Sequence, residues 1–186
     1  MTRYAMIMDT QRCIGCHSCT VACRINNDLP LDMIYNPVTT VGPMGIFPHV
    51  HMIHYPLICM HCQNAPCVSA CPSGASQQSS DGIVWVEEQK CIGCKACVQA
   101  CPYRARHPNS QTGTVQKCDF CMERTRQGKE PYCVMTCHQR ARIFGDLDDP
   151  TSEVYRLFHS ITTVQLLPEL GTDPHVYYIL SAGGQG

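Results

Sequence analysis

The chain has 186 residues, of which 44% are hydrophobic and only 16% are charged, and its 14 lysines and arginines nearly balance its 15 aspartates and glutamates. This balance excludes a basic surface for nucleic acid and an acidic tail. The low charged fraction is typical of a subunit that hides part of its surface against partners.

Sixteen cysteines are the unusual feature of the composition. Eight disulfides would use them all, but that density belongs to secreted chains, and the apolar run within Met1–Asp9 is too short for a secretory signal. No stretch of the sequence is long and apolar enough to cross a bilayer. The regular spacing of the cysteines therefore favours metal ligands over cross-links.

The first part of the chain is expected to form a strand over Tyr4–Asp9 and a short helix over Thr20–Ile25. Between them begins a cysteine run of the form C-x2-C-x2-C-x3-C, from Cys13 to Cys23.

A long insertion follows, over Pro30–Pro56. Its prolines and glycines predict an irregular but ordered surface loop, and its methionines also permit a loop that contacts a partner. We do not expect His49, His51 and His54 to bind metal, because no carboxylate pattern accompanies them.

The second run spaces Cys59, Cys62, Cys67 and Cys71 as C-x2-C-x4-C-x3-C and ends in Cys-Pro. A turn and then a strand over Ile83–Val86 are predicted to follow. Trp85, the only tryptophan, is expected to pack in the core near a cluster rather than to relay electrons.

The third run, from Cys91 to Cys101 with Pro102 after it, reads C-x2-C-x2-C-x3-C-P. This is the ligand run of bacterial [4Fe–4S] ferredoxins, in which three thiolates hold one cluster and the fourth ligates another. One such run implies a partner run.

The fourth run spaces its cysteines as C-x2-C-x11-C-x3-C, from Cys118 to Cys137. A strand over Arg142–Asp146 and a helix over Ser152–His159 are predicted beyond it. An extended tail ends in Val176–Leu180 and is expected to pack on its own domain or on a partner.

Four runs make two ferredoxin folds and four clusters, and four ligands per cluster use all sixteen thiols. Four zinc sites would use the same number. Zinc ribbons, however, pair two C-x2-C motifs and do not run three cysteines at this spacing, so the spacing favours iron–sulfur clusters.

Residues 4 to 147 resemble the four-cluster iron–sulfur subunits of membrane-associated molybdo-enzymes of the DMSO reductase superfamily. The resemblance rests on the four runs in order, on their x4 and x11 gaps, on Lys117, and on Phe144-Gly145-Asp146. The short chain and its tail around Gly171–Pro174 are most similar to the polysulfide/thiosulfate reductase type. His138 departs from the family, which usually has proline at that position.

The predicted fold class is α+β, with two ferredoxin-like modules of the bacterial 2×[4Fe–4S] kind, an inserted loop and a C-terminal extended tail. The resemblance implies that the first run pairs with the fourth and the second with the third. The expected divisions are residues 1–30 with 112–150 for the first module, 31–56 for the insertion, 57–111 for the second module and 151–186 for the tail.

The resemblance also implies the ligands of four [4Fe–4S] clusters. Carried over residue by residue, the four sets are Cys13, Cys16, Cys19 and Cys137; Cys23, Cys118, Cys121 and Cys133; Cys71, Cys91, Cys94 and Cys97; and Cys59, Cys62, Cys67 and Cys101.

By the same resemblance, the chain performs no bond chemistry itself and passes single electrons between a molybdopterin catalytic subunit and a membrane subunit that handles quinone. The first/fourth-run end is expected to face the catalytic subunit. The expected location is the periplasmic face by co-export with a partner, with the cytoplasmic face as the alternative.

The cations near the runs are expected to raise cluster potentials or to be solvated surface charges; they are Arg24, Lys90, Lys95, Arg104 and Lys117. Alternative functions are a free polyferredoxin, the cluster subunit of a formate dehydrogenase or hydrogenase complex, and a zinc scaffold.

Overall fold

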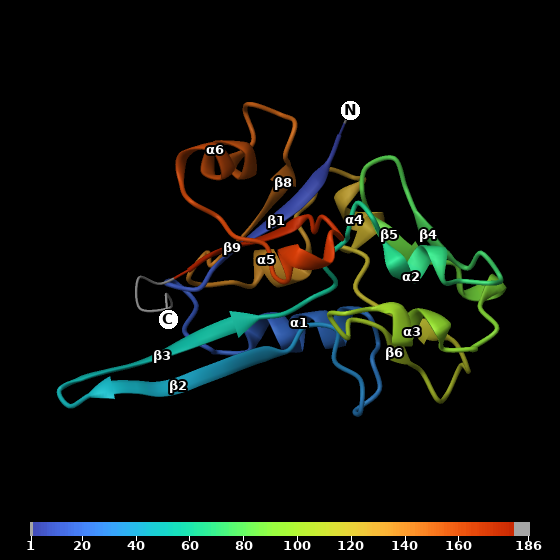
Figure 1. The fold of residues 1–186 in the computed structure, drawn as a ribbon, viewed down its shortest axis with the longest axis horizontal. Helices are drawn as coiled ribbons and strands as arrows, with labels where there is room; N and C mark the ends of the chain where they lie inside the picture. Colours follow the sequence, from blue (N-terminus) through green and yellow to red (C-terminus); the bar gives the residue numbers. More distant parts are fainter. Residues whose placement is uncertain (1, 181–186) are drawn as a thin grey trace.

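The computed structural model describes residues 2–180, which form a mixed α/β fold with small sheets and short helices (Figure 1). A three-stranded sheet lies at its centre. In this sheet β1 (Tyr4–Asp9) pairs antiparallel with β8 (Arg142–Asp146) and parallel with β9 (Val176–Ile179). The strands predicted at Tyr4–Asp9 and Arg142–Asp146 are confirmed.

Strand β1 is buried on both faces because its side chains alternate between two cores. Met6 and Met8 point into the larger core, which also contains cysteines of all four runs, while Ala5 and Ile7 point into a second, smaller core. The helix α6 (Glu153–Ser160) covers the second core, where its Val154 is fully buried (Figure 1). The predicted helix at Ser152–His159 is therefore confirmed, displaced by one residue.

Short helices lie within the cysteine runs and pack in pairs. Helix α1 (Ser18–Asn26) packs against α5 (Tyr132–Met135), and α2 (Pro66–Ser69) packs against α3 (Ala96–Ala100). The first run thus lies beside the fourth, and the second beside the third. The remaining elements are β4 (Ser76–Gln78), β5 (Val84–Val86), the 3₁₀ turn η1 (Glu88–Lys90), β6 (His107–Pro108), β7 (Val115–Gln116), α4 (Met122–Thr125) and the 3₁₀ turn η2 (Pro168–Leu170).

The insertion differs from the predicted irregular loop. Most of it is a hairpin of β2 (Val38–Ile46) and β3 (His49–Pro56), which projects from the body as an arm (Figure 1). The prediction was wrong because proline ordinarily interrupts a strand, whereas Pro43 falls in the register shift between Val41 and Met44, where a strand tolerates proline.

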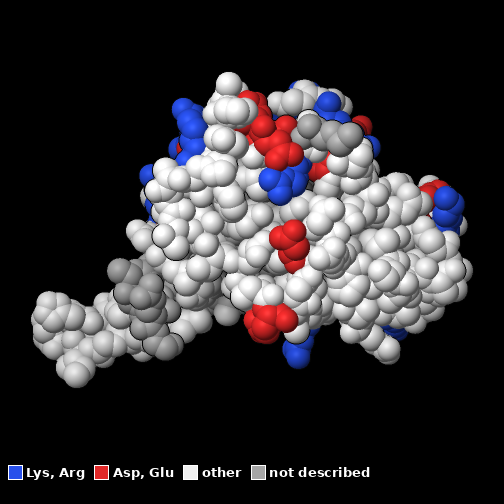
Figure 2. All heavy atoms as spheres, turned by 45° about the horizontal axis from the view of Figure 1, so that its top comes forward, with Lys and Arg blue, Asp and Glu red and all other residues white. Residues whose placement is uncertain are grey.

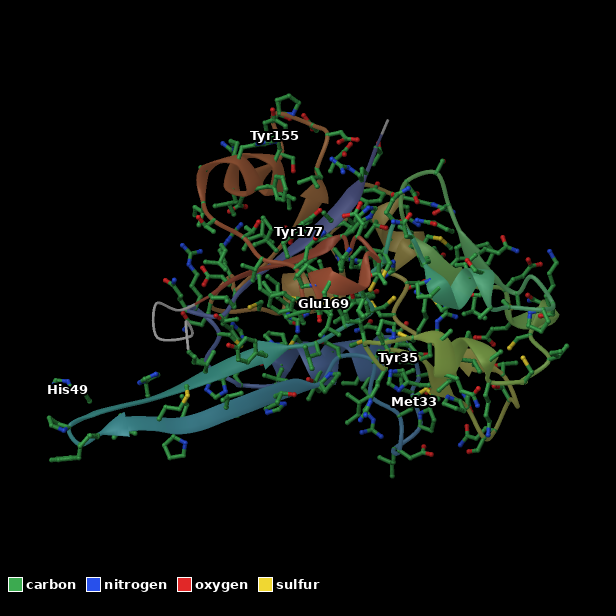
Figure 3. All side chains as sticks on the ribbon, in the orientation of Figure 1. Met33, Tyr35, His49, Tyr155, Glu169 and Tyr177 are labelled. Atoms are coloured by element: carbon green, nitrogen blue, oxygen red, sulfur yellow. The ribbon has the colours of Figure 1, made fainter. Side chains whose placement is uncertain are left out.

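The part of the insertion before the hairpin folds back on the body. Leu29, Met33 and Tyr35 form a small core with Cys23, and Figure 3 shows Met33 and Tyr35 at the body, far from His49 at the tip of the arm. This segment therefore covers the end of the first run.

The tail lies on its own chain, because β9 completes the central sheet. Tyr178 is fully buried, and its hydroxyl donates a hydrogen bond to the carbonyl oxygen of Pro56 at 2.9 Å. The tail is thus tied to the base of the arm. Within residues 2–180, no helix has the length and apolar character needed to span a membrane.

Candidate iron–sulfur centres

The thiols of the first and fourth runs surround two cavities. One cavity is lined by Cys13, Cys16, Cys19 and Cys137, together with apolar side chains that include Val38 and Pro56 at the base of the arm. The other is lined by Cys23, Cys118, Cys121 and Cys133, with Ile58 and Phe120 beside them. Each cavity offers four sulfur donors in apolar surroundings.

Thiols of the second and third runs also lie close to one another. Burial raises the pKa of the Cys62 thiol to about 12, and the neighbouring Cys59, Cys67 and Cys101 raise it too. Burial likewise raises the pKa of Cys97, and the neighbours that add to this rise are Cys67, Cys71 and Cys91.

Burial raises the pKa of eight of the sixteen thiols and makes them weaker acids. It raises the pKa of Cys23 to about 12 and that of Cys121 to about 11. Iron binds the thiolate, so loading these sites releases protons, and the affinity for iron is expected to rise with pH. Cys16, at the exposed end of the first run, differs, because a hydrogen bond with Ser18 lowers its pKa.

Backbone amides point at several of the sulfurs. The amides of Ser76, Val115 and Ala141 donate to Cys71, Cys91 and Cys137 at 3.3, 3.4 and 3.3 Å. Such donors stabilise the added negative charge of a reduced cluster and so raise its potential.

Three buried cations accompany the thiols, and only one of them, Lys117, was singled out from the sequence. Lys117 donates to the carbonyl oxygens of Val84 and Cys118. Arg106 and Arg142, which the sequence reasoning missed, are each only 3% exposed. A sequence feature that could have identified them is the motif R-A-R, which occurs twice. Each copy ends in the buried arginine, five residues after Cys101 or Cys137.

The other predicted cations lie further from the interior. Lys90, Lys95 and Arg104 are exposed, and Arg24 is half-buried. His138 is exposed as well. Trp85 is half-buried at a surface cavity that Tyr35 and Lys117 also line, so its predicted place in the core is wrong.

The donor set fits [4Fe–4S] clusters. Each of the two cavities of the first and fourth runs offers four soft sulfur ligands in an apolar setting, and buried N–H groups of Arg106 and Arg142 that have no hydrogen-bond partner could stabilise negative charge. No three His, Cys, Asp or Glu side chains among the described residues are placed to hold a single metal ion.

Gly93, in the third run, has a backbone φ of +67° and faces the carbonyl oxygen of Gly113, which a Cβ would strike. We expect Gly93→Ala to lower stability by about 1–3 kcal/mol beyond the cost of the left-handed backbone alone, because the turn at Gly113 must shift. Gly74→Ala is the matched control, since Gly74 has the same φ and no atom within 4 Å of an added methyl group. Thermal unfolding of the cluster-loaded variants measures the difference, and equal melting temperatures would contradict the expectation.

Comparison with known families agrees with this geometry. Residues 50–147 match a family described as a 4Fe-4S dicluster domain, and residues 12–75 match a second family with the same description. The fold and its sixteen thiols therefore define a ferredoxin-like protein with four [4Fe–4S] clusters.

Curated relatives show which group of four-cluster proteins the chain belongs to. The B subunit of the tetrathionate reductase of Salmonella typhimurium is 45% identical over 183 residues, covering 95% of this chain and 72% of the relative. The B subunit of the selenate reductase of Mesobacillus selenatarsenatis is 38% identical, covering 95% and 72%. The B subunit of the sulfite dehydrogenase of Allochromatium vinosum is 38% identical, covering 96% and 83%. The chain belongs to the family of iron–sulfur B subunits of molybdoenzyme reductases, which transfer electrons.

Proposed function

We propose that the four thiol groups hold the clusters in the sets implied by the family resemblance, and that the clusters form one linear path. The ligand sets are Cys13, Cys16, Cys19 and Cys137; Cys23, Cys118, Cys121 and Cys133; Cys59, Cys62, Cys67 and Cys101; and Cys71, Cys91, Cys94 and Cys97. Each cluster, when bound, accepts and gives one electron.

Three thiol pairs that join neighbouring sets support this order. Cys19 raises the pKa of Cys133, after burial and against the charge of Arg142. Cys59 raises that of Cys118, where burial is the largest cause. Cys67 raises the pKa of Cys97, where burial is again the largest cause.

The two ends of this path are open to solvent. Cys16 in the first set and Cys94 in the last are the two exposed thiols among the sixteen cysteines. A path that is buried in its middle and open at both ends suits electron transfer between two partners. This arrangement is the observation that carries the proposal.

The module division stays as proposed from the sequence. Residues 1–30 with 112–150 hold the first two sets, 57–111 hold the other two, and 31–56 and 151–186 are the insertion and the tail. The packing of α1 on α5 and of α2 on α3 supports the two pairs of runs.

The proposed partners are a molybdopterin catalytic subunit and an integral membrane subunit that handles quinone. Relatives named as the B subunits of tetrathionate reductase, selenate reductase and sulfite dehydrogenase differ in substrate, which supports substrate binding outside this chain. For this chain we favour an anaerobic respiratory reductase of the polysulfide, thiosulfate, DMSO, tetrathionate or arsenate type. It would be membrane-associated through its partners, at the periplasmic face.

The arm is proposed to bind the catalytic subunit. Its base lines the cavity of the open Cys16 end, and its tip exposes Ile46 at 85% and Phe47 at 88%. No Lys, Arg, Asp or Glu occurs between Asp32 and Asp81, and Figure 2 shows the arm without charged side chains. An anionic lipid surface would favour lysine and arginine, so an arm without lysine or arginine suits a groove in a protein.

Anaerobic purification through a tag on this chain tests the proposal. We expect about sixteen iron atoms per chain, a co-purifying molybdenum-containing subunit, and bleaching of the clusters when a quinol analogue is added to the membrane-bound complex. A monomer that carries electrons between soluble enzymes would instead support the polyferredoxin alternative, and a colourless zinc protein would contradict both.

A further inference from the structure

The same three-residue sequence follows a cysteine in each pair of runs. Below, one half of the protein means the second and third runs, and the other half means the first and fourth. Arg104-Ala105-Arg106 follows Cys101, and Arg140-Ala141-Arg142 follows Cys137. In both copies the first arginine is exposed and the second is buried. The repeat thus places one guanidinium inside each half.

Arg106 contacts a thiol of one proposed cluster set and lies near a thiol of the next. Its Nη2 donates to the Sγ of Cys67 at 2.8 Å and to the Oγ of Ser76 at 2.6 Å. Its Nε and Nη1 are buried and have no hydrogen-bond partner among the described atoms. Burial alone would lower the pKa of Arg106, but Cys67, Cys59 and Cys97 outweigh burial and raise it.

Arg142 occupies the equivalent place in the other half. Its Nη2 donates to the Oδ1 of Asn36 at 2.6 Å, and its Nη1 is buried without a partner among residues 2–180. Arg142 lines the cavity of Cys13, Cys16, Cys19 and Cys137. Burial again opposes its charge, and the nearby Cys133 and Cys19, from two different sets, raise the pKa of Arg142 despite burial.

Five ion pairs occur in the part of the chain that the structure describes, and all of them lie nearer the surface. None of them includes Arg106 or Arg142. A buried cation without a counter-charge carries a large desolvation penalty. The nearest groups able to become anionic are the thiolates on either side of each arginine, so the charge is placed where two clusters would share it.

We propose that Arg106 and Arg142 are paired tuning residues, each of which raises the reduction potentials of the two clusters in its own half. Reduction adds negative charge to a cluster, and a cation beside it stabilises the reduced form. The inference rests on the proposed ligand sets and goes beyond them, because it assigns a role to two residues that are not ligands.

The test is an EPR-monitored redox titration of the purified complex carrying Arg106→Gln or Arg142→Gln. Each substitution is expected to weaken reduction of the clusters in its own half at least tenfold, which is about 59 mV for a one-electron couple. The clusters of the other half should keep their potentials. The matched controls are Arg104→Gln and Arg140→Gln, which remove the exposed arginine of the same repeat and are expected to leave all potentials unchanged.

Iron content distinguishes an effect on the reduction potentials from an effect on cluster incorporation. A glutamine variant with four clusters and unshifted potentials would overturn the inference and leave the ligand sets unaffected. If a glutamine variant loses a cluster, the Arg→Lys variant at that position tests whether the positive charge is what matters. A lysine variant that keeps four clusters at near-native potentials supports the need for charge, and a lysine variant that fails like glutamine overturns it. Fewer than four clusters in the unsubstituted complex would instead count against the proposed function.

Discussion

A Cys94→Ser variant is expected to lose one cluster, or convert it to a form with fewer irons, and to stop electron flow between the two partners. Cys94 is the exposed thiol of the last proposed set, so its cluster would be the one that meets the partner at that end. A serine hydroxyl is a much poorer iron ligand than a thiolate, and a linear path with one member missing has no detour. The other three clusters should remain.

The measurements are iron content, the EPR spin count of the reduced complex, and turnover with quinol as the electron donor. Ile92→Ser is the matched control, because Ile92 lies in the same run and is 68% exposed. It should keep all clusters. Unchanged spin count and turnover in Cys94→Ser would contradict the ligand set.

A double substitution at the tip of the arm, Ile46→Ser with Phe47→Ser, is expected to release the catalytic subunit without loss of clusters. Burying two such side chains in a partner contributes roughly 3 kcal/mol or more, so binding should weaken at least about a hundredfold. His49, labelled at the tip in Figure 3, lies far from the body of the protein, so iron content should stay unchanged.

Co-purification of molybdenum with the tagged chain measures this effect. Ile161→Ser with Leu170→Ser is the control, since those side chains are 44% and 49% exposed on the tail, outside the arm. Retention of the catalytic subunit by the tip variant would show that the arm does not hold it. Loss of the membrane subunit alone would show that the Cys16 end of the path meets the membrane subunit.

The cluster count and the family were predictable from the sequence because iron ligation depends on the spacing of cysteines within a short stretch of chain. Two residues between successive cysteines let three thiols face one cluster, and the diverted fourth requires a second run. The strands at Tyr4–Asp9 and Arg142–Asp146 were predictable for a similar reason, since short apolar and β-branched segments next to turns favour extended backbone.

Tertiary structure alone decided the features that depend on distant contacts. From the sequence, Pro43 is expected to interrupt a strand. In the hairpin it lies in the register shift between Val41 and Met44, where a strand tolerates proline. The two arginines of each R-A-R repeat are chemically identical, and only packing buries Arg106 and Arg142 among thiols from two runs while their neighbours stay in solvent. The sequence by itself therefore determined how many clusters the chain can hold, because ligand spacing is local. The fold decided which charges stand beside them, because burial is a sum over segments far apart in the chain.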